Sequence, residues 1–192
     1  MTKNHFYEKK GPYPLKEIVK AIGSDNKIDN SNNITISGSS TLERFIIHHD
    51  RGPCMNFCKT LNLIDNPNLV DIGMNSMAQV TGINLSGCNI SSFNSGIVPY
   101  INTSIESINR EGGITSYIDA PRLHYLNLEG NDLNQYGLWN VCTMIKENFY
   151  SGSNPKGYLN IKNQKTHHSP TSTISGIIDL LSGRNWVVEY DK

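Results

Sequence analysis

The stretch LHYLNLEGNDL, residues 123–133, decides the fold. Leucines stand at its first, fourth, sixth and eleventh places, and an asparagine stands at its ninth. The same spacing starts again at Cys58 and at Val80, and a degenerate copy starts at Ile105, where Arg110 takes the sixth place. A pattern that returns at intervals of roughly 20 residues predicts stacked units that bury one shared core.

The alternation inside this unit predicts how its strand is oriented. Successive side chains of a strand point to opposite faces, so Leu126 and Leu128 are expected in the core and Asn127 outside it. The asparagine at the ninth place, Asn131 here and Asn66 in the first copy, is expected to be buried, with its amide satisfying turn carbonyls. Spacing and length are typical of leucine-rich repeats. We therefore expect an α/β fold in which residues 51–192 form an irregular leucine-rich-repeat-like solenoid.

The C-terminal third is expected to close this stack with α/β units. Residues 135–148 carry apolar side chains at helical spacing: Leu138, Val141, Cys142 and Ile145. Further expected elements are a strand at 158–161, a helix at 175–181 that ends at Gly183, and a last strand at 186–190.

Residues 1–50 are expected to form a small α+β domain that attaches the chain to an assembly. A short amphipathic helix is expected there, because four apolar residues would share one of its faces: Leu15, Ile18, Val19 and Ile22. A short strand is expected at 34–36. The Gly52-Pro53 step is strong turn punctuation, and it sets the predicted boundary.

Composition argues against several functional classes. The 192 residues carry 17 basic and 17 acidic side chains, and neither sign forms a block, so we expect no nucleic-acid partner. No stretch approaches the length of a membrane span, and the N-terminus lacks the apolar run of a signal peptide. The four cysteines lack zinc spacing and are expected to be buried free thiols, with no metal and no cofactor.

Clustered ionisable residues are few, and we expect no enzyme. The clustered histidines are His48-His49-Asp50 and His167-His168. Adjacent residues of a strand point to opposite faces, so each pair could supply one metal ligand at most. We therefore expect both clusters to lie in surface loops. The remaining candidates for carboxylate pairs are Glu106, Glu111 and Glu129. The repeat register places Glu106 and Glu129 next to strand positions on solvent faces, where charge is ordinary.

The candidate functional surface is the exposed, mostly uncharged strand face, since solenoids use such strips for recognition. Its predicted residues are Asn62, Thr81, Asn84, Ser107, His124, Asn127 and Asn160.

Two families resemble parts of the chain. From Leu126 to Tyr190, an LxLxxNxL turn, a helix, a strand, a Ser- and Pro-containing loop, a second helix and RNWVV resemble leucine-rich-repeat modules of phage tail and tail-fibre genes. Asn185 stands where that family usually has glycine. Residues 5–43, with FYEKKGPYPLKEI and ITISG, resemble the small N-terminal domain of UDP-3-O-acylglucosamine N-acyltransferases. Residues 51–192 lack the six-residue period of those enzymes' catalytic half, so acyl transfer is not expected.

The phage resemblance implies a structural or adhesive component of a phage-like virion, associated with the tail or tail fibre. Its partners would be other virion proteins in a multi-subunit assembly, together with a host-surface glycan or protein. Two alternatives stay open: a protein that decorates the capsid or stabilises the tail, and a nucleotide-sugar-binding accessory of an enzyme.

Overall fold

A computed structural model describes residues 27–28, 33–47, 58–74, 79–91, 117–118, 120, 122–148, 156–166 and 170–191. The predicted helix over residues 15–22 and the degenerate copy over 105–114 lie outside these ranges. Over the described part the chain is α/β, with helices and two mostly parallel sheets.

The strands form one large and one small sheet. The larger sheet has seven strands in the order β1 (Lys27–Ile28), β2 (Asn33–Ser37), β4 (Thr60–Ile64), β6 (Gly82–Asn84), β8 (Tyr125–Asn127), β9 (Gly157–Asn160) and β10 (Trp186–Glu189). The smaller sheet has the order β3 (Arg44–Ile47), β5 (Asp71–Met74) and β7 (Tyr117–Ile118). All neighbouring pairs are parallel except β1 with β2, which is antiparallel.

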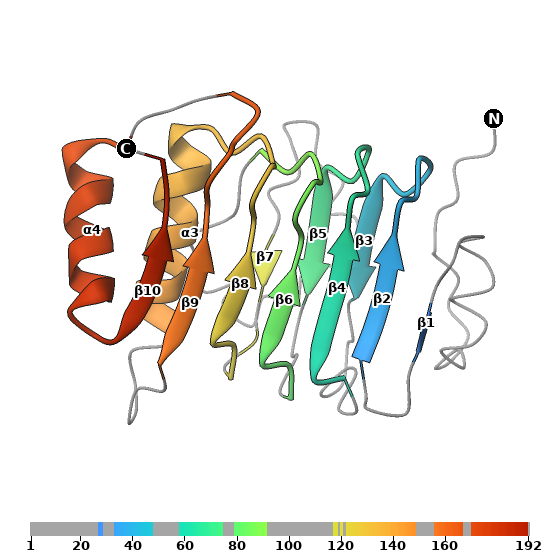
Figure 1. Cartoon of the computed structure of the whole chain (residues 1–192), viewed down its shortest axis with the longest axis horizontal. Helices are drawn as coiled ribbons and strands as arrows, with labels where there is room; N and C mark the ends of the chain where they lie inside the picture. The colour runs from blue at the N-terminus through green and yellow to red at the C-terminus, as the bar shows by residue number, and fades with distance from the viewer. Residues whose placement is uncertain are drawn as a thin grey trace, which may run out of the picture.

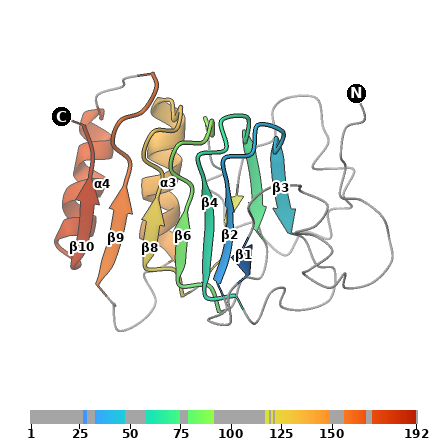
Figure 2. The ribbon, with the colours of Figure 1, turned by 45° about the vertical axis from the view of Figure 1, so that its right-hand side comes forward.

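The chain alternates between these two layers. From β2 to β8 each strand of the larger sheet is followed by one of the smaller sheet, and beyond β8 the second layer consists of α3 (Gln135–Asn148) and α4 (Ser172–Ser182). Figures 1 and 2 show the smaller sheet and both helices on the same side of the larger sheet. The opposite side, the outer face, is covered by none of the described helices and strands.

The core lies between the layers. Residues at one register of the larger sheet point into it and are all buried: Ile34, Leu61, Ile83, Leu126 and Leu159. Burying each such side chain contributes about 1.5 to 3 kcal/mol. The apolar places of the copies that start at Cys58, Val80 and Leu123 are buried as predicted.

The residue at the ninth place links each unit to the one before it. Asn131, which is fully buried, accepts from the Ile90 N–H through Oδ1 at 3.0 Å and donates through Nδ2 to the Leu85 carbonyl at 2.8 Å. Asn66 does the same with Ser39 N and Ile36 O. Cys88 and Gln164 fill the equivalent places with a thiol and a longer amide. The predicted buried asparagines are confirmed.

The residue just before the ninth place has a left-handed backbone in the units that contain β2, β4, β6, β8 and β9. The residues there are Gly38, Asp65, Gly87, Gly130 and Asn163, with φ between 54° and 69°. Glycine, asparagine and aspartate are the residues that tolerate this conformation. The sequence therefore places a residue that tolerates this turn at the same position of each of these units.

The C-terminal elements agree with the sequence. Helix α3 begins after Asn134, whose Oδ1 accepts from the Gly137 N–H at 2.9 Å, and its predicted apolar stripe is buried. Helix α4 begins after Thr171 and buries Ile174, Ile178 and Leu181.

The described strands of the N-terminal part belong to the same two sheets as the later strands. Strand β2 pairs in parallel with β4, and β3 with β5, so the described part of residues 1–50 shares the sheets of the rest and forms no separate sheet. The Gly52-Pro53 step favours a boundary in the sequence, although strands on its two sides pair with one another. Strand β6 pairs directly with β8.

Candidate functional site

Four of the predicted surface residues lie side by side on the outer face. Asn62, Asn84, Asn127 and Asn160 occupy one register position on β4, β6, β8 and β9, and we call them the asparagine row. Thr35 and Glu189 continue the row at its two ends. The prediction that strand alternation brings these side chains together is correct.

Backbone turns use part of this row. The Oδ1 atoms of Asn84, Asn127 and Asn160 each accept, at 3.0 Å, from the N–H two residues ahead. Asn62 and Asn84 are half-buried, but Asn127 and Asn160 are only 9% and 4% exposed. The expected exposed strip is therefore wrong for the last two, Asn127 and Asn160.

The other predicted residues do not join the row. Thr81 and His124 lie at the residue before β6 and β8, where the Thr81 hydroxyl donates to the Lys59 carbonyl and the His124 Nδ1 lies 3.2 Å from the Arg122 carbonyl oxygen. Ser107 lies outside the described residues.

Sequence reasoning missed a second outward row, two residues before the first. It runs Asn33, Thr60, Gly82, Tyr125, Tyr158 and Val187. The Tyr125 and Tyr158 rings stack, with centroids 5.1 Å apart and planes at 13°. The alternation that put Asn127 outside also puts Tyr125 outside, so the signal was present in the sequence.

The stacked pair is partly open to solvent. Tyr125 is 38% exposed, and Val187, at the end of the row, is 58% exposed. Partial burial raises the pKa of the Tyr158 phenol, and the negative charge of Glu189 adds to the rise. The Tyr158 phenol is therefore neutral near pH 7.

Charged groups gather beyond the carboxyl ends of β8, β9 and β10. Glu129 accepts from the amides of Asn160 and Asn163 at 3.0 and 2.7 Å. Lys162 and Glu189 form a salt bridge at 3.0 Å, which raises the pKa of Lys162. These contacts pair each charge with a neighbour. Glu189 stands at the end of the asparagine row, and Glu129 and Lys162 lie two residues beyond Asn127 and Asn160.

The described thiols are unsuited to nucleophilic chemistry. Cys58, Cys88 and Cys142 are buried and unpaired, and burial raises their pKa to about 11, 11 and 12. They are protonated near pH 7, whereas the thiolate is the reactive form. Cys54, both histidine clusters, Glu106 and Glu111 lie outside the described residues. Within the described ranges, no group of three His, Cys, Asp or Glu could hold a metal ion.

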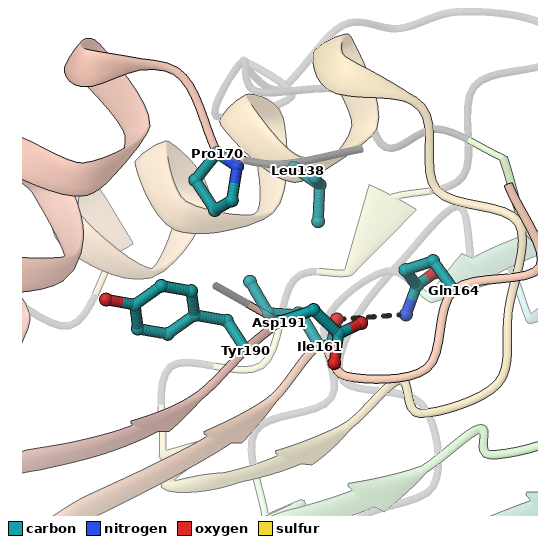
Figure 3. A pocket seen from close by; sticks show the side chains of 6 residues that line it. All are labelled: Leu138, Ile161, Gln164, Pro170, Tyr190 and Asp191. Carbon is teal, nitrogen blue, oxygen red and sulfur yellow. Dashed lines mark hydrogen bonds between the residues drawn. The ribbon is translucent and has the colours of Figure 1, made fainter. Parts of the chain in front are cut away.

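A small depression lies at the opposite layer, between α3 and the last strands (Figure 3). Its lining consists of Leu138, Ile161, Gln164, Pro170, Tyr190 and Asp191. The Gln164 amide there is committed to the Ile161 and Leu128 carbonyls and to the Leu133 N–H. The depression is a packing gap beside Gln164. The outer face is therefore the stronger candidate for function.

None of the described helices has the length and apolar character required to cross a membrane. Comparison with protein-family models, curated proteins and solved structures gave no match for this chain.

Proposed function

We propose that the chain is a non-enzymatic binding protein, built as a leucine-rich-repeat-like solenoid, that presents the outer face of its larger sheet to a partner. Support for the solenoid comes from three features that recur in each unit: an inward apolar row, a left-handed turn residue and a side chain that bonds back to the preceding unit. Such units stack on their neighbours only, and they leave one long face for recognition.

The observation that carries the proposal is the composition of that face. Two adjacent rows offer stacked tyrosines beside asparagines and carry no charged residue on β2, β4, β6, β8 and β9, while Lys27 on β1 and Glu189 on β10 stand at the two ends. Tyrosine is enriched at recognition surfaces because its ring buries much area and its hydroxyl still bonds. The second layer and both helices lie on the other side, so none of the described helices and strands covers this face (Figure 2).

The resemblance to phage tail and tail-fibre modules leads us to propose a virion component as the biological role. In that role the chain belongs to a multi-subunit particle, contacts other virion proteins, and displays the outer face toward a host-surface glycan or protein.

Mass spectrometry and immunogold electron microscopy of particles purified from the source test this role. We expect the chain in intact particles, with label on the tail. A chain found only as a free monomer, with no label on particles, would contradict the proposal.

A further inference from the structure

We propose that copies of this chain associate head-to-tail, with the basic rim of one copy against the acidic rim of the next. The basic rim is the edge of the larger sheet at which its parallel strands, β2 to β10, begin, and the acidic rim is the edge at which they end (Figure 1). The inference goes beyond the proposed function, because both rims lie beside the outer face and a contact between them leaves that face open.

Cations stand at the start of four strands of the larger sheet. They lie one to three residues before β4, β8, β9 and β10: Lys59, Arg122, Lys156 and Arg184. The first three are exposed and form no salt bridge with a described residue. Among the side chains that the structure describes, the acid on this side is Asp179 near the end of α4, and Lys146 in the last turn of α3 offsets it. This rim is therefore positive.

Carboxylates stand at the other edge, where the strands end. They lie in the turns after β2, β4 and β8 and just after β10: Glu43, Asp65, Glu129, Asp132 and Asp191. The hydrogen bonds that the last three accept come from side-chain amides, a hydroxyl and backbone N–H groups. These donors carry no charge, so the negative charge of each carboxylate remains.

Few cations oppose these carboxylates. Lys162 forms a salt bridge with Glu189, and Arg44 forms one with Asp71. In the described part of this rim, Lys165 is the remaining cation, and its ammonium donates to the Cys88 carbonyl and to Asn89. One ammonium against five carboxylates leaves the rim negative.

A second copy of the chain fits both rims at once, whereas a partner of one sign fits only one of them. The chain has 17 basic and 17 acidic residues, so its copies do not repel one another through net charge. A contact between two unlike surfaces leaves one rim of each copy open for the next copy. Head-to-tail contacts of this kind continue into rings or filaments.

The size of the rim sets the strength of the contact. Seven strands about 4.8 Å apart, with the layers about 10 Å apart, give a rim roughly 30 Å long and 10 Å deep. Two such rims bury less than about 1,200 Å² in total, which is the range of weak and transient interfaces. Exposed charges interact over about 30 Å at 0.01 M salt and over about 3 Å at 1 M. We therefore expect a weak contact that salt abolishes.

Sedimentation velocity of the full chain over a concentration series tests the association. At about 0.01 M sodium chloride we expect the average mass to rise with concentration, and at about 1 M we expect a monomer. Arg122→Glu/Lys156→Glu removes the positive charge of the basic rim, and Glu43→Lys/Asp191→Lys removes most of the charge of the acidic rim. Each double variant alone should associate at least about tenfold more weakly than the unchanged chain.

An equimolar mixture of the two double variants is the decisive sample. Each variant retains one unchanged rim, and the two unchanged rims are complementary. We expect the mixture to form a dimer with one copy of each variant and to grow no further. A symmetric contact that uses the same surface on both copies would not give this result.

Gly176→Glu is the matched control, because it adds a carboxylate in the middle of α4, where nothing lies within 4 Å of an added Cβ. It should leave the association unchanged, and thermal melts establish that each variant is folded. The proposal is overturned by a chain that stays monomeric at low salt, by folded double variants that associate as the unchanged chain does, or by a mixture that stays monomeric. Adsorption and particle labelling test the outer face separately, so either proposal can fail while the other stands.

Discussion

Single side chains on the two sides of a strand have different energetic roles. Asn131 is fully buried and satisfies three backbone groups, at Leu85, Leu128 and Ile90. Asn127 lies on the outer face and satisfies only the Glu129 N–H. When a buried side chain is removed, the backbone groups that it bonded are left without a partner. This loss costs more free energy of unfolding than the loss of one hydrogen bond near solvent.

Asn131→Ala should therefore lower the free energy of unfolding by about 2 to 4 kcal/mol, and Asn127→Ala by about 0.5 to 1.5 kcal/mol. Urea-denaturation midpoints, with m-values compared to exclude a change in cooperativity, measure both. A larger loss for Asn127→Ala would mean that the strand register is wrong.

The buried thiols predict a pH dependence of stability. Folding raises the pKa of Cys142 from an ordinary value of 9.0 to about 12, because burial disfavours the thiolate. The protonated thiol is the form that the folded state prefers, so its contribution is complete below pH 9 and is lost as the pH rises toward 12. We expect the Tm to fall across this alkaline window, and less steeply in Cys142→Ala. Equal slopes in the two proteins would show that the thiol does not contribute.

At the scale of elements, the last two strands depend on a close approach. Gly157 on β9 lies beside Trp186 on β10, and a Cβ there would lie 2.2 Å from the indole ring. Gly157→Ala must displace the Trp186 ring, which is 5% exposed. We expect a loss of about 1 to 3 kcal/mol and a red shift of tryptophan emission.

Gly176→Ala is the control for this change. Gly176 lies in α4, with nothing within 4 Å of an added Cβ. Alanine should stabilise the helix by about 0.5 to 1 kcal/mol, with no spectral shift. The close approach at Gly157 is refuted if both alanine variants leave stability and emission equal.

Elements with strong local patterns could be predicted from sequence. Helix α3 and the strand of the clearest copy follow from periodicity and lie where expected. The smaller sheet could not be predicted. Strands β3, β5 and β7 have four, four and two residues, and they exist because distant segments pair, as Phe45 does with Ile72. Short strands of this kind carry little periodicity of their own.

At the scale of the whole molecule, the repeat pattern predicted parallel strands that share one core, but not the second sheet that covers them. The unit that contains β2 was missed, because Ser39 stands at the ladder place where an asparagine was expected. The residues of the asparagine row were predicted to lie on the outward strand face, whereas the tyrosine pair was not. The prediction considered polar residues, although the same alternation also turns aromatic residues outward.

The most direct test compares two tyrosines on opposite sides of the molecule. Tyr125 lies on the outer face, while Tyr136, 78% exposed, lies on α3 in the second layer. Under the proposed role, adsorption of purified chain to envelopes of candidate host bacteria is measured for Tyr125→Ala and Tyr136→Ala, which remove the same side chain. We expect adsorption to be lost in Tyr125→Ala and retained in Tyr136→Ala. Loss in Tyr136→Ala with retention in Tyr125→Ala would contradict the outer face as the binding surface.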